Sequence, residues 1–368
     1  MNIIISGGGT GGHIFPAISI ANAMRRRYPG VNILFVGAEN RMEMEKVPDA
    51  GYPIVGLPVA GFNRKNLLKN IPVLLKLFRS MSKAKKIIND FCPDLVIGVG
   101  GYASGPVLKA AQQKGIPTLI QEQNSYAGVT NRMLAKKADA ICVAYHGMEK
   151  FFRNDNIVLT GNPVRSNILD CRLTQSEAKE KLGFPADRPL VAVVGGSLGA
   201  LTLNRSAAAA VDRFGKEGIS FLWQTGKAFA GKGEEICRGK ENIKAVPFVR
   251  EMDILYRAAD IFVSRAGAST ISELQQVGVP TILVPSPNVA EDHQRHNAEA
   301  LADRYAAVMI PDSECESRFA DEVMNLLKDK EKLSLLRTNL IEMGKECAAA
   351  DERIIDTAAG LLDKNNRK

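Results

Sequence analysis

Apolar runs of strand length alternate with helix-length segments through the first part of the chain. An apolar run at residues 2–6 ends in a glycine-rich stretch at 7–13, and helical periodicity follows over residues 16–28. Further apolar runs lie at residues 33–36, 95–99, 118–120 and 140–143. Strands and helices that alternate in this way form a parallel sheet covered on both faces. The pattern therefore predicts a doubly wound α/β domain.

The same order of elements begins again near residue 190. An apolar run at 190–194 leads into a glycine loop and an alanine-rich helix at 200–214, and further runs lie at 221–223, 243–246, 261–263 and 281–284. Gly161, Asn162 and Pro163 interrupt the periodicity between the halves. We expect two Rossmann-like domains, residues 1–163 and 164–348. A helical stretch at 348–362 follows the last strand, and only the polar tail at 364–368 is expected to be disordered.

Length and composition agree with two globular domains. The chain has 368 residues, of which 45% are hydrophobic and 24% charged, so it is too long for one ordinary α/β core. No apolar run reaches the roughly 18 residues that cross a bilayer, and no leader precedes the first strand, so we expect neither export nor a membrane span. The six cysteines are scattered without metal-binding spacing, which is typical of reduced, buried thiols in a cytoplasm.

The chain is basic, with a formal net charge of +8. Such a charge suits an anionic partner, either nucleic acid, anionic lipid or a phosphorylated substrate. One Trp, 6% aromatic residues and the lack of basic stretches interleaved with aromatic residues argue against nucleic acid. We therefore expect no nucleic-acid partner.

Four glycine-containing loops fall where predicted strands end and helices begin. Glycine lets the backbone turn tightly and approach a ligand, while the following helix offers unpaired N–H groups and a partial positive charge to an anion. A single loop of this kind is explained equally well as a tight turn that binds no ligand. Four at matching places in two halves, at the carboxyl ends of strands, favour a nucleotide-sized ligand in a cleft between facing domains. The loops lie at residues 7–13, 100–106, 195–199 and 264–270.

Two common nucleotide enzymes are disfavoured. No Gly-Lys-Ser/Thr triplet ends a glycine run, so ATP hydrolysis of the P-loop type loses support. The dinucleotide pattern fits Gly7, Gly9 and Gly12, but the acidic residue expected about 20 positions later is missing. A nicotinamide enzyme is therefore not expected.

Six motifs together resemble the MurG-type glycosyltransferase family. Its members add N-acetylglucosamine from a UDP donor to the undecaprenyl-linked muramyl-pentapeptide precursor of peptidoglycan. The resemblance covers essentially the whole chain. Its motifs are GGGTGGHIFP at 7–16, GGYASGP at 100–106, QEQN at 121–124, GNPVR at 161–165, GGSLGA at 195–200 and RAGASTISE at 265–273.

The resemblance implies the GT-B fold, with the acceptor handled by the first domain and UDP-N-acetylglucosamine by the second. It also implies that a C-terminal helix, residues 349–368, packs back on the first domain. On the donor side it points to Arg165 and Ser197 for the diphosphate, backbone of Val249 for the uracil, and Gln294 for the sugar. Phosphate, sugar and ribose contacts are carried by Ala268, Ser269, Thr270, Ile271, Ser272 and Glu273. Matching positions on the sugar and acceptor side are Thr10, Gly11, Gly12 and Asn124.

His13 is the candidate catalytic base. It follows the first glycine loop at a helix N-terminus, where a neutral imidazole, with an unperturbed pKa of about 6.5, can accept the proton of a sugar hydroxyl. The positive helix end favours the neutral form. The alternative is a first-turn residue that only orients the loop.

The departing diphosphate needs its charge neutralised, and no Asp-x-Asp pair is present to hold a metal. Helix N-termini together with Ser197, Ser269, Thr270 and Arg165 can supply that stabilisation. We expect no required cofactor, although a loosely bound Mg²⁺ that screens phosphates stays open. Arg165 could equally form a domain-linker salt bridge.

Two further candidates carry alternatives. Glu273 can accept hydrogen bonds from both ribose hydroxyls, or it can merely complement a helix dipole as an exposed first-turn residue. His293 and His296 stand three apart, but no third ligand is evident, so a metal site is not expected.

The region 62–86 is basic and carries an apolar stripe. A segment of this kind can lie on an anionic leaflet, or its stripe can pack on the sheet while its lysines are solvated. Because the expected acceptor is a lipid, we favour the membrane surface and expect a peripheral protein at the cytoplasmic face of the inner membrane. Its basic residues are Arg64, Lys65, Lys69, Lys76, Arg79, Lys83, Lys85 and Lys86, and its stripe is Ile71, Leu74, Leu75, Phe78 and Met81.

The reaction expected from the resemblance is inverting. The C4 hydroxyl of the muramyl sugar attacks the anomeric carbon directly, and no nucleophile-elbow motif argues for an enzyme nucleophile. Two other classes stay open at this point. They are a UDP-N-acetylglucosamine 2-epimerase of the same fold and a non-catalytic scaffold at the membrane.

Overall fold

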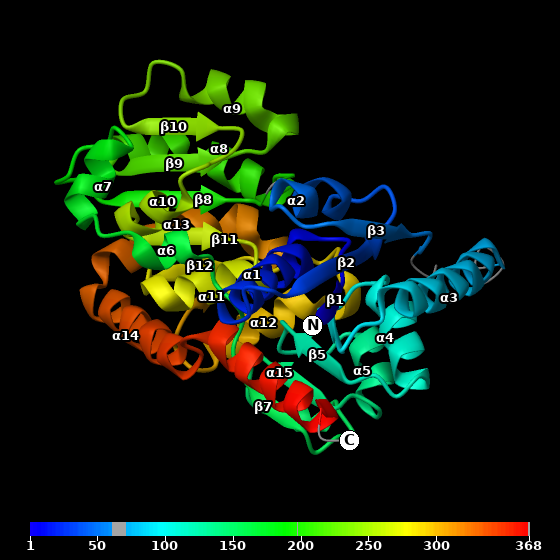
Figure 1. Ribbon diagram of the computed structural model, residues 1–368. Coiled ribbons are helices and arrows are strands. Elements are labelled where there is room, and N and C mark those ends of the chain that lie inside the picture. The colour runs from blue at the N-terminus through cyan, green and yellow to red at the C-terminus, as the bar shows by residue number, and fades with distance from the viewer. Residues whose placement is uncertain (61–70, 197, 367–368) are drawn as a thin grey trace. The chain divides into compact units, whose positions relative to one another are not determined.

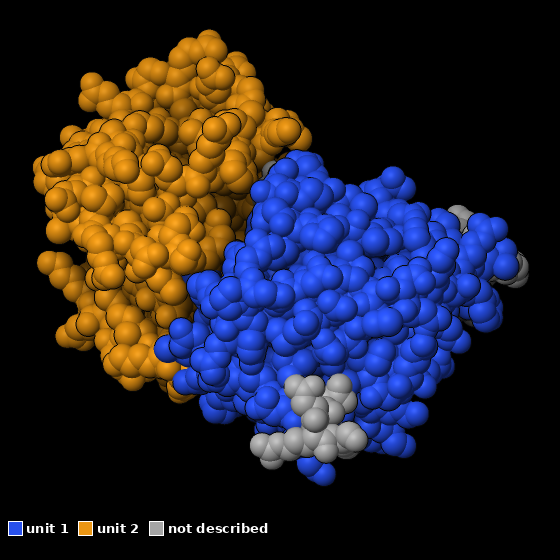
Figure 2. Space-filling view, in the orientation of Figure 1, with its two compact units in different colours: residues 1–164, 347–368 blue, residues 165–346 orange. Residues whose placement is uncertain are grey.

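The computed structural model describes residues 1–60, 71–196 and 198–366. The chain forms two compact units (Figure 2). Unit 1 consists of Met1–Val164 and Cys347–Lys368, and unit 2 of Arg165–Glu346. Each unit contains one parallel β-sheet with helices packed against it (Figure 1).

Within the described residues of unit 1, the sheet has seven strands in the order β3-β2-β1-β4-β5-β6-β7, all paired in parallel. The central strands are buried on both faces, which is why they read as continuous apolar runs; Ile3, Ile4 and Ile5 have no exposed surface. The strands are β1 (Asn2–Ser6), β2 (Asn32–Ala38), β3 (Ile54–Leu57), β4 (Leu95–Gly98), β5 (Thr118–Glu122), β6 (Ala140–Val143) and β7 (Ile157–Leu159).

Helices cover this sheet from two sides. Ile14, Ile20 and Met24 of α1 share a core with β1 and β4, and Ile354 and Ala358 of α15 belong to the same core. Arg26 and Asp351 also form an ion pair at 2.7 Å, so the C-terminal helix packs on α1 within unit 1. Helix α4 packs on β4 and on α3. The helices are α1 (Gly11–Arg27), α2 (Glu43–Asp49), α3 (Ile71–Phe91), α4 (Ser104–Gln113), α5 (Val129–Ala135), η2 (Met148–Lys150) and α15 (Ala350–Asn366).

The sheet of unit 2 has six parallel strands in the order β10-β9-β8-β11-β12-β13. Val191, Val193 and Phe221 face a core shared with α8 and α13, and Trp223 is fully buried there. The strands are β8 (Leu190–Val194), β9 (Ser220–Gln224), β10 (Ile243–Val246), β11 (Ile261–Ser264), β12 (Thr281–Leu283) and β13 (Val308–Met309).

The helices of unit 2 follow its strands in alternation. They are α6 (Ser166–Asp170), α7 (Gln175–Lys181), α8 (Leu201–Lys216), η3 (Lys227–Phe229), α9 (Ala230–Cys237), α10 (Met252–Ala258), α11 (Ala268–Val277), η4 (Ala290–Asp292), α12 (His293–Ala302), η5 (Asp312–Glu314), α13 (Cys315–Lys328) and α14 (Lys330–Glu346). Both sheets reverse their strand order at one central point, between β1 and β4 and between β8 and β11. Ligands of doubly wound proteins bind at such points, beyond the carboxyl ends of the strands.

Some expectations about the elements were wrong. Helix α1 begins at Gly11 rather than at Pro16, because the carbonyl of Thr10 already accepts from the N–H groups of His13 and Ile14. The strands β3, β7 and β13 were not expected; each is short and lies at or next to a sheet edge, so its apolar signal is weak. The expected disordered tail is helical as far as Asn366.

Candidate functional site

In unit 1 the two predicted glycine loops meet beyond β1 and β4. A Cβ atom added to Gly101 would lie 2.3 Å from the carbonyl oxygen of Gly8, and one added to Gly7 would lie 2.2 Å from the side chain of Val99. Gly101 also has a φ of +83°, which side chains rarely adopt. Glycine is therefore required here so that the two loops can pack backbone against backbone.

His13 lies in the first turn of α1 beside these loops. Its Nδ1 atom is 3.1 Å from the carbonyl oxygen of Gly8 and 3.3 Å from Oγ1 of Thr10. A carbonyl oxygen only accepts, so the contact with Gly8 requires Nδ1 to be the donor, which assigns a proton to that nitrogen. A Cβ atom on Gly100 would come within 3.0 Å of Nε2, so glycine at this position makes room for the imidazole ring.

Thr10, Gly11 and Gly12 surround His13 as expected from their positions. Thr10 is the N-cap of α1 and exposed, and Gly11 and Gly12 are the first helical residues. The N–H groups of a first helical turn have no partner within the helix. The structure therefore brings these four residues together at one helix N-terminus.

The sequence analysis missed Glu43, the first residue of α2. Its side chain is 1% exposed. The carboxylate accepts the N–H of Gly9 at 3.1 Å and the N–H of Ala38 at 2.9 Å. A Cβ atom on Gly8 would lie 2.1 Å from this carboxylate, and one on Gly37 would lie 2.6 Å from Cγ of Glu43. Glycine at positions 8 and 37 leaves space for the buried side chain of Glu43. This contact depends on the tertiary structure and has no local signal in the sequence.

The loop after β5 is also organised by a buried carboxylate. Glu122 is 2% exposed and accepts the backbone and side-chain N–H groups of Asn124, both at 3.1 Å. It also accepts from Gly128 at 3.0 Å and from the side chain of Asn131 at 2.8 Å. Because β5 neighbours β4, Asn124 lies at the same edge of the sheet as the glycine loops.

In unit 2 the third glycine loop joins β8 to α8. A Cβ atom on Gly199 would lie 2.3 Å from the carbonyl oxygen of Thr225, and one on Gly195 would lie 2.7 Å from the amide nitrogen of Ala200. A larger side chain at position 195 or 199 would collide with the backbone, which explains why glycine occupies both positions. The candidate Ser197 lies outside the described residues.

The fourth loop leads from β11 into α11, whose N-cap is Gly267. Ser269 stands in the first turn, and its hydroxyl oxygen is buried without a hydrogen-bond partner among the described residues. Ala268 is nearly buried, Thr270 is half-buried, and Ile271 belongs to the interior. The Ser272 hydroxyl donates to the carbonyl of Ala268 at 3.0 Å. An orphaned hydroxyl at a helix N-terminus is a ready partner for an anionic ligand.

Glu273 and Arg165 form one cluster, together with a residue that the sequence analysis missed. Arg165, the N-cap of α6, donates to Oε1 of Glu273 at 2.8 Å, and Tyr256 donates its hydroxyl to Oε2 at 2.8 Å. Arg165 therefore forms a salt bridge, and both residues of that bridge belong to unit 2. Glu273 is 6% exposed and lies in the second turn of α11, so the alternative of an exposed first-turn residue is wrong.

Charge and burial shape this cluster. Partial burial lowers the pKa of Arg165, but the hydrogen bond and charge of Glu273 outweigh it and leave that pKa raised. Burial, and then the negative charge of Glu273, raise the pKa of the Tyr256 hydroxyl well above its usual range. Tyr256 is therefore protonated and acts as a donor to the carboxylate.

Val249 follows β10 and is buried. Its N–H donates to Oε1 of Gln224 at 3.0 Å, while Nε2 of Gln224 donates to the carbonyl of Gly196 at 2.9 Å. Gln224, which the sequence analysis did not single out, thus joins the third glycine loop to the segment expected to contact the base.

Gln294 lies on α12, where its side-chain oxygen accepts the N–H of Ser286 at 2.9 Å. His296 is 3.3 Å from Glu299 on the same helix. Within residues 1–60, 71–196 and 198–366, no group of three His, Cys, Asp or Glu residues is arranged to hold a metal ion.

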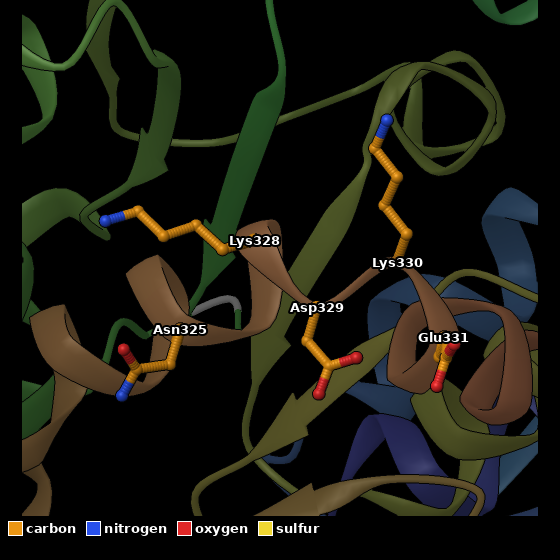
Figure 3. A pocket seen from close by; sticks show the side chains of 5 residues that line it. All are labelled: Asn325, Lys328, Asp329, Lys330 and Glu331. Carbon is orange, nitrogen blue, oxygen red and sulfur yellow. The ribbon is translucent and has the colours of Figure 1, made fainter.

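An open groove elsewhere in unit 2 lies where α13 gives way to α14 (Figure 3). Its lining is polar and mostly charged, and Asp329 caps α14 by accepting the N–H of Lys332 at 2.9 Å. The side chains of Lys328 and Lys330 extend away from one another (Figure 3). The groove contains none of the predicted site residues.

Helix α3 covers the second half of the basic region 62–86, whose residues 62–70 lie outside the described part. Near its start the apolar side chains are exposed, with exposed fractions of 58% for Leu75 and 72% for Phe78. Farther along, Ala84 and Ile88 are buried against the unit. The stripe residues Leu74, Leu75 and Phe78 are therefore exposed and do not pack on the sheet, while contact of this region with a membrane stays a prediction. Among the described helices none is both long and apolar enough to span a bilayer.

Comparisons with known proteins match this arrangement. The glycosyltransferase family 28 N-terminal domain matches residues 3–143, and the family 28 C-terminal domain matches residues 190–354. Proteins from Porphyromonas gingivalis and Parabacteroides distasonis bear the name UDP-N-acetylglucosamine–N-acetylmuramyl-(pentapeptide) pyrophosphoryl-undecaprenol N-acetylglucosamine transferase. The first is 53% identical, covering 100% of this chain and 97% of that protein; the second is 52% identical, covering 98% of each.

A solved structure agrees with these relatives. The crystal structure of Acinetobacter baumannii MurG superposes with a TM-score of 0.76 at 27% identity, over 97% of this chain and 98% of that one. Both domains of the fold and nearly the full length are thus matched by one group of enzymes. The chain belongs to glycosyltransferase family 28, among the MurG-type N-acetylglucosamine transferases.

Proposed function

We propose that this chain transfers N-acetylglucosamine from UDP-N-acetylglucosamine to the muramyl sugar of undecaprenyl-pyrophosphoryl-MurNAc-pentapeptide. The relatives are named for this reaction. The observation that carries the proposal is the buried hydroxyl of Ser269 at the N-terminus of α11, which has no hydrogen-bond partner among the described residues. A phosphate oxygen bound there would satisfy it.

The donor occupies unit 2. Its diphosphate binds to the first turn of α11 through Ser269 and Thr270 and to the glycine loop that contains Ser197, while Val249 contacts the uracil and Gln294 the sugar. Glu273, oriented by Arg165 and Tyr256, accepts from the ribose hydroxyls. The helix N-terminus and these donors stabilise the negative charge of departing UDP, so the chemistry requires no cofactor. A Mg²⁺ ion that only screens the phosphates is compatible with this role.

The acceptor meets unit 1, at the edge formed by the glycine loops and Asn124. The C4 hydroxyl oxygen attacks the anomeric carbon while its proton passes to Nε2 of His13. The bond from that carbon to the β-phosphate oxygen breaks, and UDP leaves with the electron pair. Attack opposite to UDP inverts the configuration and gives a β-linkage.

The exposed start of α3 supports contact of unit 1 with the lipid that carries the acceptor. Leu74, Leu75, Leu77 and Phe78 are exposed there beside Lys76 and Arg79. Apolar side chains inserted among headgroups, with cations facing anionic lipid, are typical of peripheral binding. We therefore assign the protein to the cytoplasmic face of the inner membrane, with no nucleic-acid partner.

A product analysis tests the proposal. The chain is incubated with radiolabelled UDP-N-acetylglucosamine and a short-chain lipid-linked muramyl acceptor, and the products are separated. The expected result is labelled lipid that requires the acceptor. An epimerised UDP-sugar without acceptor would instead indicate the epimerase, and the absence of both product and UDP binding would indicate a scaffold.

A further inference from the structure

Glu43 is a buried acid that the proposed reaction does not use directly. Its carboxylate is enclosed by protein, with a side chain 1% exposed, and contacts no predicted substrate position. Both of its oxygens lie 3.1 Å from the amide nitrogen of Gly9, and Oε1 is also 2.9 Å from that of Ala38. Burying a carboxylate that makes no hydrogen bonds costs free energy. Charge-assisted hydrogen bonds from the backbone offset that cost, so these contacts hold the loop in one conformation.

The loop that Glu43 fixes is the one that orients His13. Gly9, the partner of Glu43, is joined by a single peptide bond to Gly8, whose carbonyl oxygen lies 3.1 Å from Nδ1 of His13. Gly8 has a φ of +148°, and a Cβ atom there would meet the carboxylate at 2.1 Å. The peptide between Gly8 and Gly9 is therefore held on one side by Glu43 and holds the imidazole on the other.

We infer that Glu43 is a positioning residue for the proposed base: its carboxylate sets the Gly8–Gly9 peptide, and the Gly8 carbonyl thereby orients the imidazole and keeps the proton of His13 on Nδ1. This inference rests on the proposed function for its catalytic consequence. The part that concerns structure, namely which ring nitrogen of His13 carries the proton, does not depend on any substrate.

The variant Glu43→Gln keeps the shape of the side chain but replaces one acceptor oxygen by a donor. Because misplacement of a reacting group by about 1 Å can cost 100-fold, we expect kcat to fall roughly 10- to 100-fold. The KM for UDP-N-acetylglucosamine and the affinity for UDP should not change, because the donor site lies in unit 2. A role in folding alone would lower thermal stability without separating kcat from these values.

Two further measurements separate positioning from general structural damage. The chain has only four histidines, so ¹⁵N-labelled imidazole signals can be assigned with His13→Ala. Wild type should show His13 protonated at Nδ1, and Glu43→Gln should show a mixture of tautomers. In a double-mutant cycle, Glu43→Gln should add nothing to the loss caused by His13→Ala, since it acts through that residue.

Asp94→Asn is the matched control. Its carboxylate accepts the N–H of Asn2 at 2.7 Å, at the opposite end of β1 from the glycine loop. It should change neither kcat nor the His13 signals. If Glu43→Gln fails to fold, Glu43→Asp, which keeps the charge but shortens the side chain, replaces it in each measurement.

The inference is overturned if folded Glu43→Gln keeps the wild-type tautomer and kcat, or if its effect multiplies with that of His13→Ala. If the proposed function is wrong, the measurements would give a different set of results. The wild type would then form no labelled lipid, while the imidazole signals of wild type and variant would still test the link from Glu43 to His13.

Discussion

The hydroxyl of Tyr256 donates to one carboxylate oxygen of Glu273 at 2.8 Å, while Arg165 donates to the other oxygen at the same distance. Tyr256 lies on α10 and Glu273 on α11, so two adjacent helices fix the direction of one buried acid. A carboxylate oxygen accepts more than one hydrogen bond, which leaves capacity for ribose hydroxyls. If Glu273 binds the ribose as proposed, the packing of α10 and α11 sets how that carboxylate meets the nucleotide.

Replacing Tyr256 by Phe should weaken the discrimination between ribose and 2′-deoxyribose in the bound nucleotide. A hydrogen bond to a charged group contributes about 1.5–3 kcal/mol, so wild type should prefer UDP over 2′-deoxy-UDP roughly ten- to a hundredfold. In Tyr256→Phe we expect that preference to shrink toward unity, because Glu273 loses its fixed orientation. Isothermal titration of both nucleotides measures the ratio.

The matched control is Tyr52→Phe in unit 1, which removes a hydroxyl that donates to Asn22 at 2.7 Å. It should leave the preference for UDP intact. Because the pKa of Tyr256 is raised by burial and by Glu273, its hydroxyl stays protonated through neutral pH. An unchanged UDP preference in Tyr256→Phe would show that Glu273 does not depend on this contact.

Ser269→Ala should separate binding from stability. The Ser269 hydroxyl is buried without a partner among the residues that the structure describes, so its removal should not lower the free energy of unfolding. UDP affinity should fall about tenfold, since one phosphate hydrogen bond is lost. Denaturant unfolding and UDP titration on the same sample provide both values.

Ser206→Ala offers a comparison for that experiment. Its hydroxyl is already bonded, donating to the carbonyl of Thr202 at 2.9 Å. Ser206→Ala should keep UDP affinity, in contrast to Ser269→Ala. A Ser269→Ala protein that binds UDP normally would place the phosphates away from α11.

The exposed start of α3 should govern membrane binding. Burying a large apolar side chain is worth about 1.5–3 kcal/mol, so the double variant Leu75→Ser/Phe78→Ser should bind anionic vesicles at least about tenfold more weakly. Sedimentation with vesicles of mixed neutral and anionic lipid measures this. Leu335→Ser is the control, because Leu335 is also exposed, at 48%, but lies on α14 of unit 2. Equal binding by both variants would exclude α3 as the contact.

Cysteine reactivity should report on how α15 packs against unit 1. Burial raises the pKa of Cys142 to about 12, although hydrogen bonds with Thr357 of α15 and with Thr160 partly offset it. The thiolate is the reactive form, so at pH 8 a maleimide should label exposed Cys92 and spare Cys142. Mass spectrometry of peptides identifies the labelled residues. Rapid labelling of Cys142 in the native protein would mean that α15 leaves the sheet easily.

Much of the fold could be predicted from hydrophobic pattern alone. Strands such as residues 190–194 are buried on both faces and therefore read as uninterrupted apolar runs. The edge strands β3, β7 and β13 were not predicted because they are short and partly exposed, as with Val308–Met309. The start of α1 was misplaced because Pro16 suggested a helix start, whereas glycines 11 and 12 adopt helical conformation.

The candidate site could be predicted only where motifs are local. His13, Ser269 and Glu273 lie in or next to glycine loops, and these loops can be recognised in the sequence itself. Glu43, Gln224 and Tyr256 act through contacts with residues distant in sequence, so nothing local marks them. The pairing of Arg165 with Glu273 likewise joins residues 108 positions apart, and no periodicity predicts it.

We propose that sugar transfer uses His13 as the base and needs no metal. The most direct test is the single-turnover rate of transfer to the lipid-linked acceptor in the presence of EDTA, for wild type and His13→Ala. We expect wild type to keep its rate and the variant to be at least about 100-fold slower with unchanged UDP affinity, since general-base catalysis contributes roughly 10²–10⁴-fold. A His13→Ala enzyme as fast as wild type, or a wild type inactivated by EDTA, would contradict the account.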